Sequence, residues 1–214
     1  MKPYYEHSGI TIYHGDCREI LPSLAGFDLL LTDPPYGIGV NTDNSRFSGG
    51  NNPEIRGGAV RDSVIGDDEQ FDPTFLIEYG EEQVIWGWNN FPDKLPRGAC
   101  LVWLKRYDDA FQSFLSDAEL AWMSKGHGVY CRRDLSNNAI TGERTHPTQK
   151  PLTLMRWCLS FFPKVESVLD PFMGSGTTLR AAKDLGRRAI GIEIEEKYCE
   201  IAAKRLSQEV MSFE

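Results

Sequence analysis

The stretch Val168-Leu169-Asp170-Pro171-Phe172-Met173-Gly174-Ser175-Gly176-Thr177-Thr178 decides how the whole chain is interpreted. It contains a short apolar strand, a carboxylate, a tight glycine loop and the start of a helix. Glycines let the backbone approach a ligand closely, and free N–H groups at a helix N-terminus favour an anionic group. The pattern indicates a nucleotide-type cofactor site. Such a loop usually comes early in an α/β domain, whereas here it lies near the end of 214 residues.

Apolar segments of strand and helix length alternate along the rest of the chain. Strands are predicted at residues 10–13, 27–31, 83–88, 99–104, 118–123, 167–169 and 188–194. Helices are predicted at residues 17–24, 71–79, 151–162, 177–185 and 195–208. Strands that alternate with helices predict a parallel α/β sheet. The polar segment 125–145 lacks this pattern and is interpreted as an inserted recognition segment.

Composition predicts one globular domain, residues 1–214, without a metal or a membrane span. The five cysteines are scattered and the four histidines show no ligand spacing, so reduced thiols and no metal site are expected. No apolar run approaches the ~20 residues that a membrane span needs. The first six residues are polar and lack a signal-peptide core, which predicts a cytoplasmic protein.

The charge of the chain is unevenly distributed. A net charge of −8 argues, taken alone, against nucleic-acid binding, which usually needs a basic surface. Residues 97–150, however, contain eight basic and six acidic side chains. A mildly basic middle segment in an acidic protein is compatible with a local DNA-facing surface.

Three acidic residues follow predicted strands: Asp16, Asp170 and Glu193. Each alone could be an ordinary helix cap. Together they would lie at the carboxyl ends of parallel strands, where α/β sheets bind ligands, and an acid at the position of Glu193 typically binds ribose hydroxyls. Leu179 stands where the dinucleotide fingerprint has its third glycine, which disfavours a nucleotide-dependent dehydrogenase.

The segment Asp33-Pro34-Pro35-Tyr36 follows the strand predicted at 27–31. The prolines restrict the backbone and cannot donate hydrogen bonds, so their carbonyl groups are available as acceptors. A planar amino group could donate one hydrogen to the Asp33 carboxylate and the other to the Pro34 carbonyl, while its ring stacks on Tyr36. Two such acceptors would localise the nitrogen lone pair and stabilise the positive charge that develops on attack. The alternative is a rigid turn after a buried strand.

Three motifs together resemble those of the amino-group DNA methyltransferases that use S-adenosylmethionine. They are Thr32 to Gly37, His146 to Pro151 and Asp170 to Thr177, and the resemblance extends from about Ile10 to Leu206. Their order resembles the β-type arrangement, in which the catalytic half precedes the cofactor half. The resemblance implies a Rossmann-like class I methyltransferase sheet, mostly parallel, with helices on both faces and a circularly permuted motif order.

The resemblance also implies roles for individual residues. Asp33, Pro34, Pro35 and Tyr36 would hold the target base. The cofactor would be bound by Asp16, Cys17, His146, Thr148, Gln149, Lys150, Asp170, Phe172, Gly174, Ser175, Gly176, Thr177 and Glu193. Within that set, Glu193 would hold the ribose, Asp16 would meet the adenine amino group, and the turn at Lys150 would close over the cofactor. Contacts to DNA would come from Lys105, Arg132 and Arg133. For Lys105, an ordinary solvated lysine is an equally good interpretation.

The activity implied is methyl transfer from S-adenosylmethionine to the N6 amino group of adenine in double-stranded DNA. The base would be flipped out of the duplex, and the transfer would be one in-line displacement without a covalent cysteine intermediate. Two alternatives stay open: transfer to the N4 amino group of cytosine, and an inert module that only binds S-adenosylmethionine. A role in restriction-modification or as a solitary enzyme is equally open.

One feature departs from the family. The segment available to read DNA sequence, residues 107–145, is short for a target-recognition insertion. Sequence recognition could be relaxed, or assistance could come from a second subunit in a homodimer or from residues 38–66. That segment is rich in Gly, Asn, Ser and Asp and is predicted to be a mobile loop.

Overall fold

The computed structural model describes residues 2–24, 26–39, 65–112, 116–135 and 149–208. The chain forms two compact units, Met1–Pro34 with Asp72–Glu214, and Pro35–Phe71. Most of the predicted loop, residues 40–64, lies outside the described residues, as do 113–115 and 136–145 of the predicted insertion. Within the described ranges, no helix is both long and apolar enough to cross a membrane.

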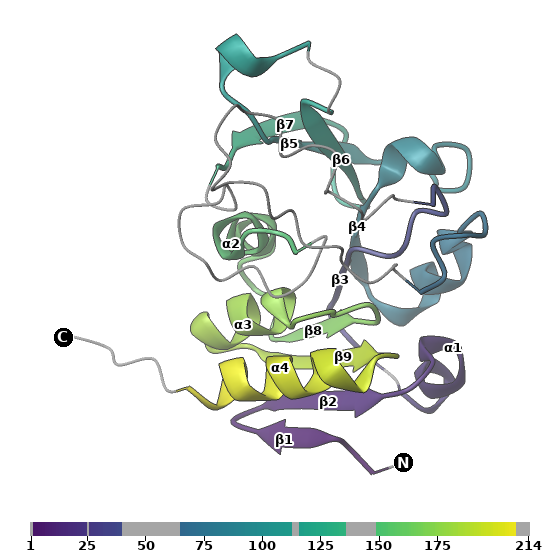
Figure 1. Cartoon of the computed structure of the whole chain (residues 1–214), viewed down its shortest axis with the longest axis vertical. Helices are drawn as coiled ribbons and strands as arrows, with labels where there is room; N and C mark the ends of the chain where they lie inside the picture. The colour runs from purple at the N-terminus through teal and green to yellow at the C-terminus, as the bar shows by residue number, and fades with distance from the viewer. Residues whose placement is uncertain (1, 25, 40–64, 113–115, 136–148, 209–214) are drawn as a thin grey trace, which may run out of the picture. The chain divides into compact units, whose positions relative to one another are not determined.

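The larger unit is built on a nine-stranded sheet with the order β1-β2-β9-β8-β3-β4-β6-β5-β7 (Figure 1). Its strands are β1 (Tyr5–His7), β2 (Ile10–His14), β3 (Leu29–Thr32), β4 (Glu82–Trp86), β5 (Ala99–Leu104), β6 (Ala118–Met123), β7 (Val129–Arg133), β8 (Ser167–Asp170) and β9 (Arg188–Glu193). This mostly parallel sheet confirms the predicted fold class.

Strand direction brings the ends of distant segments together. Strands β2, β9, β8, β3 and β4 are parallel, and β7 is parallel to β5. Strand β6 is antiparallel to both β4 and β5, so β5 again points the same way as β4. The carboxyl ends of every strand except β1 and β6 therefore meet at one edge of the sheet, together with the start of β6.

Helices and short helical turns connect the strands. They are α1 (Cys17–Ile20), η1 (Leu21–Ser23), η4 (Pro73–Tyr79), η5 (Trp88–Asn90), η6 (Asp108–Ala110), α2 (Leu152–Ser160), α3 (Thr177–Asp184) and α4 (Glu196–Ser207). Helix α3 contacts both α2 and α4, and these helices pack against one face of the sheet. Apolar side chains from this face and from the helices form one core cluster.

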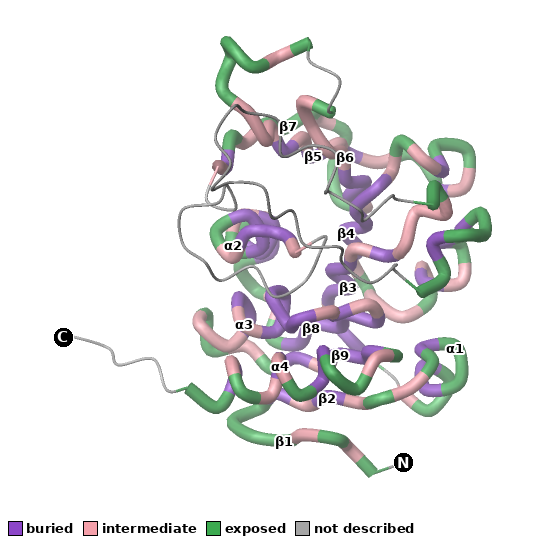
Figure 2. The backbone as a smooth tube through the Cα atoms, in the orientation of Figure 1, coloured by how far each residue is buried: buried purple, intermediate pink, exposed green. Residues whose placement is uncertain are grey.

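The other face of the sheet is covered as well. Residues alternate along a strand, so Leu30 faces away from Leu29 and Leu31, which belong to the helix-packed core. Leu30 and its partner Leu169 on β8 are nevertheless 0% exposed. Figure 2 shows the central strands buried, whereas β1 is largely exposed. Burial on both faces explains why the central strands are continuous apolar runs.

The predicted elements are present with ends shifted by a few residues, and two strands were not predicted. Residues 125–145 contain β7, whose sequence Val129 to Arg133 lacks an apolar alternation because the strand lies exposed at the sheet edge. Strand β1, at the opposite edge, is equally exposed and is held by antiparallel pairing to β2. The segment predicted as a helix over 71–79 is the 3-10 turn η4, begun by the Asp72 cap and Pro73.

Candidate active site

The predicted acidic residues all lie at the carboxyl edge of the sheet. Asp170 and Glu193 end β8 and β9, Asp33 follows β3, and Asp16 follows β2. Since β2, β9, β8 and β3 are consecutive in the sheet, these four carboxylates follow neighbouring strands. The sheet thus brings the two halves of the predicted site to one place.

A hydrogen bond links the strand before the predicted catalytic segment to the strand before the glycine loop. The Thr32 hydroxyl donates to Asp170 Oδ1 over 2.7 Å, although the two residues are 138 positions apart. The Phe172 N–H donates to the same oxygen over 3.2 Å. Both Thr32 and Asp170 are buried, so their positions are fixed by the pairing of β3 with β8.

Burial raises the pKa of the Asp170 carboxyl to about 6. Hydrogen bonds from the Thr178 and Thr32 hydroxyls and the Phe172 N–H work in the opposite direction, and the nearby Asp33 carboxylate adds to the rise. The carboxylate form of Asp170 is therefore costly in the cofactor-free protein. A ligand that carries positive charge would lower this cost, which suits Asp170 to binding a cation.

Asp170→Asn is expected to stabilise the cofactor-free protein near neutral pH. The ordinary pKa is 3.8, so the folded state retains a proton that the unfolded chain releases. Wild-type stability therefore falls as pH rises from about 4 to about 6, by up to about 3 kcal/mol, and this loss disappears in the variant. Urea unfolding of both proteins across this window measures the difference.

Asp28→Asn is the opposite control, because the Glu166 and Ser167 N–H groups lower the pKa of Asp28. The Asp28 carboxylate therefore stabilises the wild-type protein at pH values above its ordinary pKa, and this contribution is lost as pH falls. Asp28→Asn removes the contribution, so this variant should lose stability near neutral pH. Identical pH dependence of Asp170→Asn and the wild type would show that the Asp170 carboxylate is not penalised by burial.

Glu193 anchors the glycine loop from the next strand. Its Oε2 accepts the Gly174 N–H over 3.0 Å, and its Oε1 accepts the Glu195 N–H over 2.8 Å. Burial raises the pKa of Glu193, while these N–H groups oppose the rise. The predicted ribose-binding carboxylate is thus already fixed against the loop, and its contact with a ribose remains a prediction.

The loop itself is held by α4 and by the segment before α2. Gly176 has φ +77°, and a Cβ there would lie 2.9 Å from the Ala202 Cβ on α4. The Arg205 guanidinium, also on α4, donates to the Ser175 carbonyl over 2.8 Å. The Ser175 hydroxyl donates to Gln149 Oε1 over 3.1 Å, which brings the segment before α2 to the loop. Thr177, the first residue of α3, is buried.

Asp16 and Cys17 follow directly after a residue, Gly15, that is hydrogen-bonded to Glu193, and their contact with an adenine remains a prediction. The Gly15 N–H donates to the Glu193 carbonyl over 2.9 Å. The exposed Asp16 side chain accepts the Arg18 N–H over 2.8 Å and so caps α1, whichever ligand it also meets. Burial raises the pKa of the Cys17 thiol to about 12, so it is protonated and suited to packing rather than to nucleophilic attack.

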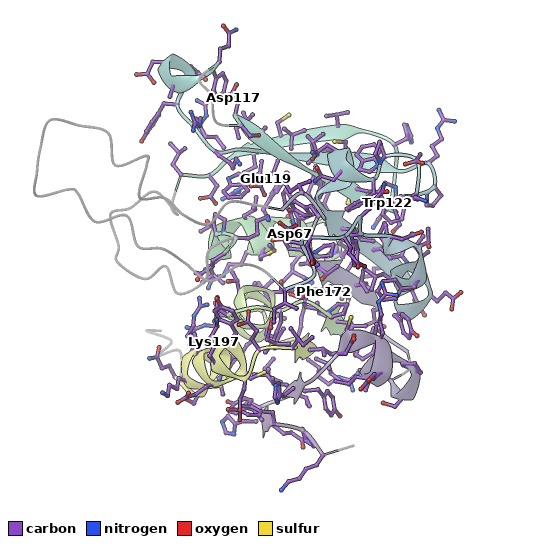
Figure 3. The ribbon with its side chains drawn as sticks, turned by 45° about the vertical axis from the view of Figure 1, so that its right-hand side comes forward. Asp67, Asp117, Glu119, Trp122, Phe172 and Lys197 are labelled. Atoms are coloured by element: carbon purple, nitrogen blue, oxygen red, sulfur yellow. The ribbon has the colours of Figure 1, made fainter. Side chains whose placement is uncertain are left out.

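Lys150 lies against the predicted catalytic carboxylate. Its Nζ is 2.5 Å from Asp33 Oδ2 and 2.9 Å from Glu119 Oε2. Glu119, labelled in Figure 3, lies near the start of β6 and also pairs with Lys105 over 2.9 Å. The predicted cofactor segment therefore divides: Gln149 contacts the glycine loop, whereas Lys150 contacts Asp33.

The basic residues predicted to bind DNA lie at the same edge of the sheet. Arg132 and Arg133 end β7, and Lys105 follows β5, which pairs with β7. Arg132 lies 3.7 Å from Asp134, and Arg133 forms an ion pair with Asp108. Each has an acidic partner within the protein, so a phosphate would have to compete for it, and their contact with DNA remains a prediction.

The smaller unit, Pro35–Phe71, contains a carboxylate that fixes the backbone after Tyr36. Asp67 Oδ1 accepts the Tyr36 N–H over 3.0 Å and the Gly37 N–H over 2.9 Å. Gly37 has φ +71°, and a Cβ there would lie 2.2 Å from the Glu69 carbonyl oxygen. This turn explains the glycine that follows the predicted catalytic segment.

Several of these residues were not singled out from the sequence. Thr32 stood inside a motif and could have been noticed as a hydroxyl at a strand end. Glu119, Asp67 and Arg205 carry no local signal, because each acts on a segment distant in the sequence. Conversely, the predicted cofactor residues His146 and Thr148 lie outside the described residues.

Known proteins are similar to this chain in sequence and in fold. The chain is 28% identical to the type II methyltransferase M.ScaI of Streptomyces caespitosus, over 99% of this chain and 86% of that protein. The crystal structure of the M1.HpyAVI–SAM complex matches with a TM-score of 0.56 at 24% identity, covering 93% of this chain and 100% of that chain. The cytosine-N4-specific PvuII DNA methyltransferase matches with a TM-score of 0.64 at 17% identity, covering 99% and 91%.

The family match covers the part of the larger unit that contains Lys150, the glycine loop and Glu193, and it begins after Asp16 and Asp33. Residues 85–204, which begin within β4 and end within α4, match the N6/N4 methyltransferase family described as DNA methylase. Because this match extends over more than half of the 214 residues, the chain belongs to the N6/N4 DNA methylase family.

Proposed function

We propose that this DNA methylase transfers a methyl group from S-adenosylmethionine to the exocyclic N6 amino group of adenine in double-stranded DNA. The observation that carries the proposal is the position of Asp33. Asp33 comes directly after Thr32, and the Thr32 hydroxyl donates a hydrogen bond to Asp170 at the start of the glycine loop. An acceptor for an amine and a cofactor loop are thus adjacent.

The residues around the glycine loop fit S-adenosylmethionine. Asp170 and Glu193 are buried carboxylates whose pKa values are raised by burial, so both favour a ligand that brings positive charge or hydroxyl donors. The cofactor has an ammonium group and ribose hydroxyls and, when bound, supplies an electrophilic methyl group. We assign the ammonium end to Asp170 with Phe172, the ribose to Glu193, and the adenine to Asp16 with Cys17.

The catalytic residues act on the nitrogen that attacks the methyl group. The Asp33 carboxylate and the Pro34 carbonyl accept the two amino hydrogens, which orients the lone pair and stabilises the developing positive charge. Tyr36, next but one in the chain, supplies a ring on which a flipped base can stack. Lys105, Arg132 and Arg133 position the DNA backbone, because contacts to phosphates orient a duplex without reading its sequence.

The chemical identity of the product tests the proposal. We expect DNA incubated with the enzyme and methyl-labelled S-adenosylmethionine to yield labelled N6-methyladenine after digestion to nucleosides. Chromatography with mass spectrometry separates it from N4-methylcytosine. Labelled N4-methylcytosine alone would replace adenine by cytosine as the target, which is the specificity of the PvuII enzyme of the same fold.

Mapping of the modified positions in a genome of known sequence then gives the target site. A single short motif would indicate that the residues between β5 and α2 read sequence despite their small number. Modification at many unrelated sites would indicate relaxed recognition. Light scattering with and without DNA measures whether the enzyme works as a homodimer.

A further inference from the structure

A chain of alternating charges extends from the predicted catalytic carboxylate into the sheet. Asp33 pairs with Lys150, Lys150 with Glu119, and Glu119 with Lys105, over 2.5, 2.9 and 2.9 Å. Its members come from β6, from the segment after β3, from the segment after β5 and from the residue two before α2. Two lysines and two carboxylates balance one another, so the group carries no net charge.

Lys150 is the central and most buried member of this chain. Its side chain is 4% exposed, against 18% for Asp33 and 24% for Glu119. Its ammonium also lies 5.6 Å from the ring centre of Trp86 and 6.0 Å from that of Trp103, within the range of a cation–π interaction. A buried ammonium is costly unless it is paired, so this position is specified rather than incidental.

Glu119 shows how strongly the lysines act. Burial alone would raise the pKa of its carboxyl, but Lys150 and Lys105 outweigh burial and lower it to about 2. Glu119 is therefore ionised at any physiological pH and is a permanent partner for Lys150. Because Glu119 holds one side of the ammonium, the other side is directed at Asp33.

The residue before Lys150 fixes the same segment to the cofactor loop. Gln149 accepts the Ser175 hydroxyl over 3.1 Å, and Arg205 on α4 donates to both the carbonyl and the hydroxyl of Ser175. Two adjacent residues thus contact the glycine loop and Asp33. The lysine is held in place by its own charge partners and by the side-chain hydrogen bond of the adjacent Gln149.

We propose that Lys150 is a positioning residue that holds the Asp33 carboxylate, ionised and oriented, beside the cofactor loop. The inference rests on the proposed function, because only in that function does the Asp33 carboxylate accept a hydrogen from the substrate amine. Lys150 itself does not touch the reacting atoms. It keeps Asp33 as an acceptor, since a protonated carboxyl would present a donor to the amino group and lose the charge that stabilises attack.

The charged groups that face Asp33 set the expected pH dependence. Lys150 is a cation in contact with it, Glu119 and Lys105 lie behind Lys150, and the Asp170 carboxyl on β8 is close enough to interact electrostatically. Without Lys150, both carboxylate neighbours would favour protonation of Asp33. The acidic limb of the pH–activity profile should then move to higher pH by about 1–3 units.

The test compares Lys150→Met with Lys105→Met. Both variants remove a lysine from Glu119 and from the face of Trp103, but only Lys150 contacts Asp33. We expect Lys150→Met to shift the acidic limb of kcat and to lower kcat at neutral pH by about 10-fold or more, with little change in KM for the methyl donor. Lys105→Met loses a proposed phosphate contact, so it should raise KM for DNA while the acidic limb of kcat stays at the wild-type pH. Lys150→Arg should recover most of the wild-type limb.

Lys150→Met could unfold the protein by leaving Glu119 without its partner, so Lys150→Met/Glu119→Gln is the second variant. It removes one charge of each sign, and circular dichroism reports whether it is folded. A wild-type kcat and pH profile in a folded double variant would overturn the proposal. An inactive wild-type enzyme would contradict the proposed function instead, so the two failures are distinguishable.

Discussion

Replacing Asp33 with asparagine is expected to lower kcat for methyl transfer by about 10²–10³-fold, the usual effect of removing one group that stabilises developing charge. Asparagine has nearly the same shape but is neutral, and its amide can present a donor where the substrate amine also donates. Transfer of radiolabelled methyl groups to DNA measures kcat, and calorimetric titration measures cofactor affinity. The affinity should change little, because the predicted cofactor contacts come from other residues.

Asp93→Asn is the matched control, since Asp93 is an exposed aspartate in the turn between η5 and β5 and is not part of the proposed site. It should retain full activity. If Asp33→Asn were as active as the wild type, the Asp33 carboxylate would not contact the reacting amine. If the wild type and Asp33→Asn both bound the cofactor but neither methylated DNA, the chain would be an inert binding module.

Gly176→Ala should destabilise the protein by about 2–5 kcal/mol and abolish cofactor binding. The left-handed backbone at φ +77° is unfavourable for any residue with a Cβ, and the new methyl group would meet the Ala202 Cβ at 2.9 Å. Strain contributes about 1–2 kcal/mol and overpacking about 1–3 kcal/mol. To avoid the contact with the Ala202 Cβ, the loop would have to move. Its N–H groups are predicted to face the cofactor, so the movement would disrupt the binding site. Denaturant unfolding and calorimetric titration measure the two effects.

Gly186→Ala separates the two causes. Gly186 has φ +69°, but a Cβ there would meet nothing within 4 Å, so only the conformational strain remains. This variant should lose about 1–2 kcal/mol and bind the cofactor normally. Adding Ala202→Gly to Gly176→Ala should restore part of the lost stability, and no recovery would show that contact with α4 does not explain the glycine.

The sequence was sufficient to predict the fold class and the edge at which the acidic residues meet. Apolar runs indicated the positions of the strands, and the carboxylates that end or follow β2, β3, β8 and β9 indicated the side of the sheet, because parallel strands share one direction. Asp33 and Asp170 could be placed together for this reason. Prediction reached that far because every step used either local pattern or a general rule of α/β sheets.

The charge chain around Lys150 could not be predicted by the same reasoning. Glu119 reaches Lys150 only because β6 is inserted antiparallel between β4 and β5, which brings the start of that strand to the carboxyl edge. No pattern near Glu119 reveals this reversal. The edge strands β1 and β7 were missed for a related reason, since their pairing depends on a neighbour rather than on apolar alternation.

The strand order has a consequence for how the protein is made. Strands β8 and β9 lie between β2 and β3, although they come from residues 167–193 and their neighbours from residues 10–32. During synthesis, β2 and β3 leave the ribosome long before the two strands that separate them. Their apolar edges remain without partners until then, and contacts over such separations form slowly. The central sheet therefore assembles only after nearly the whole chain has emerged, when aggregation is the main competitor of folding.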